Sequence, residues 1–276
     1  MMNNIQLEAT ASPGNFVTML GVASMVYLAL GVLGINFAID PGYASPIFPA
    51  AGFAVAFLLW SGKRSWPAIW VGSFVLNLNI AWLHGDLGWR SAALGAGIAT
   101  ACTLQALAAR WLVVRGIQDG WQTLEEERAI VRCLALAGPL ACLMASSIAV
   151  PLLYWAKLVP AAGCLYAWWN WWFGDMMGVL VFLPLSLAIF HHRQPLWRSR
   201  LMTLMLPMLI ALGLVGGAFV VSAKWERSQE KQDISRHGED MAQLLAQRFI
   251  AHQEALSALR RLLEVTPDMK LSLIHI

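Results

Sequence analysis

Long runs of apolar residues, separated by short polar segments, set the pattern of this chain. A membrane-crossing helix needs about 20 predominantly apolar residues. Seven runs reach or approach that length, so we expect an all-α integral membrane bundle of about seven transmembrane helices. In chain order, the runs cover residues 16–39, 46–60, 66–83, 91–114, 129–155, 166–190 and 201–221.

The second run is short for a full crossing, and it begins in a segment with two prolines, SPIFPAAG, at residues 45–52. We expect a broken or re-entrant entry there, which is tolerated only where protein or water covers the open backbone. Pro139 and Pro151 predict kinks in the fifth run. The PAAG sequence recurs at residues 160–163, either by coincidence or as a trace of duplicated halves.

Composition supports the membrane assignment. Hydrophobic residues make up 58% of the chain and charged residues 13%, whereas soluble domains are nearer 45–50% and 25%. The 14 tryptophans fit interfacial aromatic belts. The net charge of +3 comes from scattered basic residues, which indicates no nucleic-acid partner. We find no HExxH and no phosphate-binding loop, which removes two common enzyme classes, and no CxxC pair. We expect no catalytic residue, metal or cofactor.

Lysine and arginine in short loops predict the orientation, because basic loops stay cytoplasmic. Every second loop is basic, and the alternate loops offer only Arg90 and Lys157. We therefore expect a multi-pass protein of the bacterial inner membrane, with residues 1–15 cytoplasmic and those after about 222 extracytoplasmic. The basic loops carry Lys63, Arg64, Arg115, Arg128, Arg193, Arg198 and Arg200.

The composition changes abruptly at Lys224. Apolar residues then recur at close to heptad spacing, which predicts a long extracytoplasmic amphipathic helix over residues 223–270. The stripe could pair with a second copy in a parallel homodimer through span seven and residues 224–264, or pack on a domain not present here. We expect residues 271–276 to be a frayed or non-native tail, and the chain to be a fragment.

Asp175 is the acidic residue that lies deepest in an apolar run. Placing a carboxylate there costs about 2.5–3.5 kcal/mol on insertion scales, so a function is the default hypothesis. The alternative is an Asp that only packs helices together, flanked by the close-contact glycines Gly174 and Gly178.

We expect other polar and aromatic residues to converge with Asp175 on a signal-sensing pocket. Asparagines at helix contacts often form interhelical hydrogen bonds, and tryptophans often anchor at the interface, so both simpler roles stay open. The candidates are Asn170, Asn77, Asn79, Trp168, Trp171 and Trp172.

Two stretches resemble the first class of MASE-type domains, the membrane-associated sensors of bacterial signalling proteins. Residues 47–78 carry an aromatic-Pro-x-x-Gly entry and a Gly-basic-x-x-Trp-Pro turn, and residues 171–185 carry aromatic-x-Gly-Asp-x-x-Gly followed by Pro. Residues from 224 on resemble the first helix of a CHASE-type extracytoplasmic sensor domain. The motif positions are Pro49, Gly52, Gly62, Trp66, Pro67, Gly174, Gly178 and Pro184.

The resemblance implies a non-enzymatic sensory input module. It also implies a parent protein with a diguanylate cyclase, a cyclic-di-GMP phosphodiesterase or a histidine kinase as output. Two other readings stay open: a small transporter that uses Asp175 as a proton or cation site, and a membrane anchor without ligand.

Overall fold

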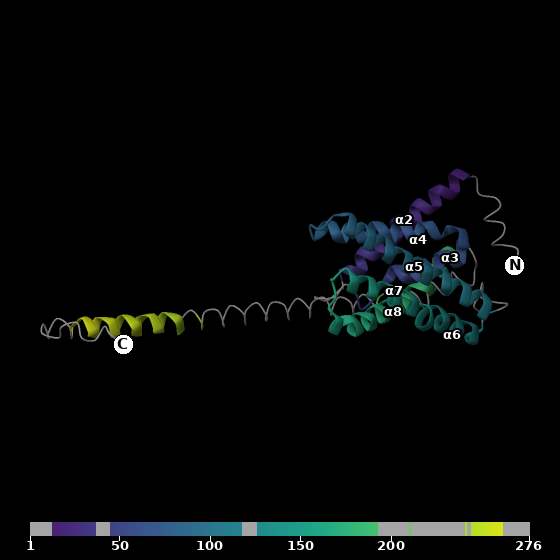
Figure 1. Ribbon diagram of the computed structural model, residues 1–276. Helices are drawn as coiled ribbons and strands as arrows, with labels where there is room; N and C mark the ends of the chain where they lie inside the picture. Colours follow the sequence, from purple (N-terminus) through teal and green to yellow (C-terminus); the bar gives the residue numbers. More distant parts are fainter. Residues whose placement is uncertain are drawn as a thin grey trace. The chain divides into compact units, whose positions relative to one another are not determined.

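The computed structural model describes residues 13–36, 45–117, 126–192, 210, 241 and 244–261. Every regular element in these ranges is helical. The chain divides into two compact units, Met1–Gly216 and Gly217–Ile276, and helices α2 to α8 all belong to the first unit (Figure 1). The expected span at 201–221 and the tail at 271–276 lie outside the described residues, apart from Ile210.

Five helical segments of the described chain are long and apolar enough to cross a membrane. They confirm five of the expected runs, and the ends differ from the predicted ones by a few residues. The segments are built from α2 (Pro13–Ile35), α4 (Trp66–Leu83), α5 (Trp89–Gly116), α6 (Glu127–Ala135) continuing through η2 (Leu136–Leu140) into α7 (Cys142–Trp155), and α8 (Cys164–Phe190).

Helix α3 (Pro49–Ser61) corresponds to the short second run and lies inside the bundle. Every one of its 13 residues except Trp60 is buried. It packs mainly against α8, and also against α2 and α5. A helix that is apolar all round has to be covered on every side by protein or lipid, and here protein covers it.

The chain enters α3 through a non-helical segment, Ser45–Phe48, that lies against α8. The backbone N–H of Phe48 donates to the carbonyl oxygen of Gly174 at 3.0 Å. A Cβ at Gly174 would overlap the carbonyl oxygen of Ser45, and one at Gly178 would overlap that of Phe48. The two glycines therefore let the backbone of this non-helical entry lie directly against α8, a closer approach than the helix packing that the sequence suggested.

The non-helical entry also bears on how so short a helix fits a membrane domain. Thirteen helical residues rise about 20 Å, which is short of the roughly 30 Å of a bilayer core. The chain reaches the helix through the entry, which bends at Pro46. The open backbone is tolerated at this depth because α8 covers it.

One of the two prolines that were expected to kink the fifth crossing lies at an interruption of its α-helix, and a kink at the other, Pro151, stays a prediction. Pro139 lies in the π-helical segment η2, between α6 and α7, and Pro151 lies within α7. Proline removes a backbone donor, and the carbonyl groups that it frees need other partners. The indole N–H of Trp172 on α8 donates to the carbonyl oxygen of Pro139 at 2.9 Å, which ties the interrupted turn to α8.

The described part of the second unit, residues 244–261, is helical. Several large apolar side chains of this helix are exposed: Leu244, Leu245, Phe249, Leu256 and Leu259. Their spacing agrees with the expected apolar stripe. The remaining residues of the predicted long helix lie outside the described ranges, apart from Met241.

Candidate functional site

Asp175 lies in the interior of the first unit, on α8, and only 3% of it is exposed. Its neighbour Gly174 holds the non-helical entry of α3 against the same helix. The close approach that Gly174 and Gly178 permit therefore places the start of α3 beside the carboxyl group. Asp175 faces protein rather than lipid.

A small cavity of about 10 Å³ lies next to the Asp175 carboxyl group. A volume of about 10–15 Å³ is what one water molecule needs, so the cavity has no room for a metabolite. Four helices and the entry of α3 contribute to its wall. The lining residues are Tyr27, Phe48, Ala51, Ala54, Cys102, Gln105, Ala106 and Asp175.

Two neutral side chains are hydrogen-bonding neighbours of the Asp175 carboxyl group: Gln105 from α5 and Trp171 from α8 itself. Trp171 precedes Asp175 by four residues, which places both on one face of the helix. Gln105 is only 3% exposed, its Nε2 donates to the Cys142 sulfur at 3.5 Å, and its Oε1 is buried with no donor. None of the lining residues is a lysine, arginine or histidine.

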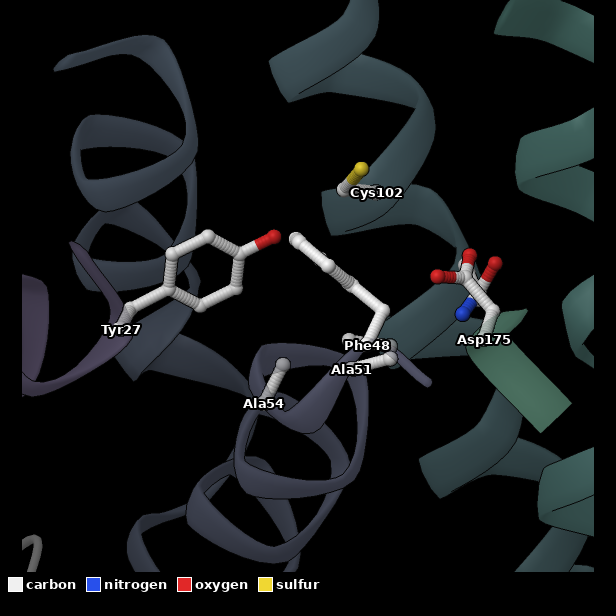
Figure 2. A pocket seen from close by; sticks show the side chains of 8 residues that line it. Tyr27, Phe48, Ala51, Ala54, Cys102 and Asp175 are labelled. Carbon is white, nitrogen blue, oxygen red and sulfur yellow. The ribbon is translucent and has the colours of Figure 1, made fainter. Parts of the chain in front are cut away.

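Tyr27 is a second polar residue of the cavity wall, on the side opposite Asp175. Its side chain is 1% exposed, and the Ser73 hydroxyl and Cys102 thiol are its hydrogen-bonding neighbours. Figure 2 shows the Phe48 ring standing between Tyr27 and Asp175. The Tyr27 and Phe48 rings meet edge to face with centroids 6.5 Å apart. Phe48 thus separates two polar groups that share one cavity.

The Asp175 carboxyl group faces the N-terminal end of α3, because Phe48 and Ala51 line the same cavity. The N-terminus of a helix carries partial positive charge, which favours a nearby carboxylate. Pro49 occupies the first turn, where its missing N–H is no loss. The helix end therefore gives the buried charge partial compensation.

Arg110 on α5 lies at the opposite end of α3. Its Nε donates to the carbonyl oxygen of Leu58 at 2.8 Å. The backbone N–H of Gly62 donates to the same carbonyl oxygen, with Gly62 at a φ of 93°. A cation at a helix C-terminus complements the macrodipole, so the two ends of α3 meet charges of the favourable sign.

The three asparagines that we expected near Asp175 do not line its cavity. Asn170 precedes Asp175 by five residues, which turns it about 140° around α8 at 3.6 residues per turn. Asn77 donates from Nδ2 to the backbone oxygen of Ser73 on its own helix at 2.8 Å, and Asn79 is half-buried on the same helix. Their part in sensing stays a prediction.

Of the expected tryptophans, Trp171 lies beside Asp175, and the other two bind the neighbouring helix. Trp168 donates to the Ser147 hydroxyl at 3.1 Å, and its ring stacks on Trp172 with centroids 6.2 Å apart. Together with the bond from Trp172 to Pro139, these contacts hold α7 and η2 to α8. They are structural contacts, and a ligand-contacting role for either ring stays a prediction.

The remaining motif positions shape the ends of α3 and α4 and the course of α8. A Cβ at Gly52 would overlap the α8 backbone at Gly178, so the glycine lets α3 approach α8. Gly62 ends α3 with a positive φ, which suits a residue without a side chain. Trp66 and Pro67 open α4, and Pro184 lies inside α8.

Sequence reasoning missed three residues that line the cavity, Tyr27, Phe48 and Gln105, and it missed Arg110 at the other end of α3. Gln105 and Arg110 had a usable signal, since polar side chains inside an apolar run tend to face the bundle interior. Phe48 is the aromatic residue of the entry motif. Tyr27 gave no signal, because a tyrosine in an apolar run is equally common at the membrane interface.

Among the described residues, no group of three or more His, Cys, Asp or Glu is placed to hold a metal ion. The fold and site define a multi-pass helical membrane domain with a polar group buried at the entry of an interior helix. A model of the MASE1 family matches residues 19–226, and the chain belongs to that family. MASE1 is a membrane-associated sensory domain of signalling proteins. Neither a curated protein nor a solved structure matches the chain.

Proposed function

We propose that this chain is the input module of a bacterial signalling protein and that Asp175 lies at its receiving site. The observation that carries the proposal is a carboxyl group, 3% exposed, at the N-terminal end of a helix in which every residue except Trp60 is buried. A change in its charge or ligation alters the field at the end of α3. Because α3 packs on α2, α5 and α8, a shift of α3 is felt by most of the bundle.

The mechanism is a shift between two arrangements of the helices. A stimulus can shift such an equilibrium only through different affinity for the two states. The cavity holds about one water molecule, so the stimulus acts there as a very small species or reaches the site indirectly. The output is a diguanylate cyclase, a cyclic-di-GMP phosphodiesterase or a histidine kinase.

The proposed orientation places the basic loops in the cytoplasm of a bacterial inner membrane. Lys63 and Arg64 are exposed at the end of α3, and Arg115, Arg128 and Arg132 line one hollow where α5 ends and α6 begins. Residues after about 222 are then extracytoplasmic. Labelling of single cysteines at positions 63 and 224 with an impermeant maleimide tests this, and labelling from the same side would contradict it.

The second unit supports a further part of the proposal. The exposed apolar side chains of residues 244–261 suit a parallel homodimer in which two copies of this helix pair. The helix is proposed as the start of a CHASE-type extracytoplasmic domain. Cysteine cross-linking at position 249 in membranes should trap a dimer if the helices pair at this stripe, and absence of the dimer would contradict the pairing.

The test of the input role is a fusion. The full chain is joined through a foreign single membrane span to a diguanylate cyclase domain, and cyclic-di-GMP is measured in cells. We expect Asp175→Asn to change the output by about threefold or more, while Asp86→Asn, an exposed loop residue, leaves it unchanged. Equal output from Asp175→Asn and wild type, at equal membrane expression, would contradict the proposal and favour a ligand-free anchor.

One observation keeps a transporter as the second candidate. A broken helix entry beside a buried carboxylate is also the arrangement of ion sites in many secondary transporters. Cation or proton flux into proteoliposomes separates the two functions. Flux that depends on Asp175, together with a fusion output insensitive to Asp175→Asn, would favour the transporter.

A further inference from the structure

Three arginines surround one hollow at the place where α5 ends and α6 begins. Arg115 belongs to the last turn of α5, and Arg128 and Arg132 belong to α6. All three residues are exposed, and the hollow that they share has a volume of about 460 Å³. Sites for small ligands have volumes of about 300–1,000 Å³, so this hollow can hold a ligand of that size. The remaining described lining residues are Gly116, Ile117, Glu126 and Ala129.

The charge of the hollow is unbalanced. Its described lining holds three cations and one anion, Glu126, which gives a formal charge of +2. Arg128 and Arg132 are four residues apart on α6, so they lie on one face of the helix and repel each other. Arg128 also lies in the first turn of α6, where the partial positive charge of the helix end disfavours a cation. A bound anion would offset both repulsions.

The position of the hollow along the helices indicates which anion is within reach. It lies where two segments that are long and apolar enough to cross a membrane end, Trp89–Gly116 and Glu127–Trp155. Trp111, one turn before Arg115, is 52% exposed, and the guanidinium carbon of Arg115 lies 4.7 Å from its ring centroid. Tryptophan is enriched at the level of the lipid headgroups. Val131, on α6, is exposed as well, so apolar side chains flank the charges. The anion at this depth is a lipid phosphate.

We propose that Arg115, Arg128 and Arg132 bind the phosphate of an anionic phospholipid. Guanidinium groups recognise phosphate through paired, charge-assisted hydrogen bonds. Basic pockets between membrane helices are places where anionic headgroups bind. The lipid would neutralise the excess charge, rest its upper acyl carbons against the flanking apolar side chains, and fasten α5 to α6. The hollow shares no described lining residue with the Asp175 cavity, so lipid binding does not depend on the proposed input role.

The experiment measures thermal unfolding of the purified full chain in dodecyl maltoside micelles, by tryptophan fluorescence, with phosphatidylglycerol or phosphatidylcholine added at equal mole fraction. With phosphatidylglycerol ten times above its Kd, we expect a Tm about 3–6 °C higher than with phosphatidylcholine. The combined variant Arg115→Gln, Arg128→Gln and Arg132→Gln should lose most of this difference. Arg90→Gln is the matched control and should keep it, because Arg90 lies at the other end of α5, 5.6 Å from the Trp89 ring centroid and outside the hollow.

A second combined variant separates a built site from diffuse attraction between basic loops and an anionic surface. Replacement of the same three arginines by lysine keeps the charge but removes the planar fork, so about half of the phosphatidylglycerol effect should disappear. An undiminished effect in this lysine variant would overturn the site in favour of diffuse attraction.

The other outcomes are equally distinct. Equal Tm values of wild type in the two lipids, or an equal phosphatidylglycerol effect in wild type and the combined glutamine variant, would overturn the site. Equal stabilisation by water-soluble glycerol 3-phosphate, without added lipid, would overturn the lipid as the source of the phosphate. Should the combined glutamine variant not fold, the same comparison between Arg128→Gln and Arg90→Gln decides, and equal lipid effects in these two would overturn the site.

Discussion

The two ends of α3 each meet one charged side chain, in very different surroundings. At the C-terminal end, Arg110 donates directly to the Leu58 carbonyl oxygen, and the rings of Trp60 and Phe190 stack with centroids 4.9 Å apart. At the N-terminal end, Asp175 lines a cavity and has neutral neighbours, one of which, Gln105, has a buried Oε1 without a hydrogen-bond donor.

The difference separates a structural charge from a functional one. The C-terminal end is well packed, and its charge has a direct backbone partner. The N-terminal end keeps space and an incompletely compensated charge, which reduces stability but leaves a site that a stimulus can alter. Buried polar groups that lower stability are expected where a protein has a function to perform.

The largest effect is expected where the non-helical entry of α3 touches α8. In Gly178→Ala the new Cβ would overlap the Phe48 carbonyl oxygen. This oxygen belongs to the backbone, which cannot move aside as easily as a flexible side chain. We expect a loss of about 3 kcal/mol, at the upper end for overpacking. Thermal unfolding in detergent checks this. Gly21→Ala on α2 is the matched control, since nothing lies within 4 Å of its Cβ; equal Tm values for both variants would show that the entry does not pack on α8.

The next effect concerns the C-terminal end of α3. Arg110→Met keeps much of the side-chain length but removes the donor to Leu58, and hydrogen bonds from charged groups contribute about 1.5–3 kcal/mol. We expect Tm to fall accordingly. Arg115→Met on the same helix is the control, because its exposed guanidinium lies over the Trp111 ring at 4.7 Å and contributes about 0.5–1 kcal/mol. A smaller fall in Tm for Arg110→Met than for Arg115→Met would contradict the proposed difference between the two ends of α3.

A smaller effect is expected where α8 holds the interrupted crossing. Trp172→Phe removes the donor to the Pro139 carbonyl oxygen and should cost about 1 kcal/mol. Trp169→Phe, with an exposed ring, should stay within about 0.5 kcal/mol. If the two variants unfold at the same temperature, Trp172 does not stabilise the wall behind Asp175.

The smallest effect is expected at Asn77. Its Nδ2 donates within its own helix, to the Ser73 oxygen, so Asn77→Ala should cost about 0.5 kcal/mol or less. The interhelical bond that the sequence suggested would cost up to about 2 kcal/mol. A loss of that size, or a fusion output altered as strongly as by Asp175→Asn, would place Asn77 in the site after all.

The sequence predicted most of the helices, because apolar length decides whether a segment can cross a bilayer. The run predicted at 91–114 corresponds to the helix Trp89–Gly116, and the run predicted at 166–190 corresponds to the helix Cys164–Phe190. It did not predict that α3 is enclosed by protein while α2 exposes Val17, Val22 and Met25. Both helices are apolar all round. Lipid and protein interiors select similar residues, so the sequence does not distinguish a helix covered by protein from one covered by lipid.

The site was predicted only in part, for a geometric reason. Asp175, Trp171 and the two glycines follow from spacing on a single helix. Gln105 and Tyr27 come from other helices, and their approach depends on how the bundle packs. Asn170 precedes Asp175 by five residues, which turns it well away around α8, so its part in sensing stays a prediction.

The most direct test of the account compares Asp175→Asn with Arg110→Met in one experiment, by thermal unfolding in choline chloride at neutral pH. Replacing a buried and incompletely compensated charge by a neutral isostere should raise Tm. Removing a charge that has a direct backbone partner should lower it. Shifts of opposite sign are the predicted result. A fall in Tm for both variants would show that the two charges are equally structural and would contradict Asp175 as the receiving site.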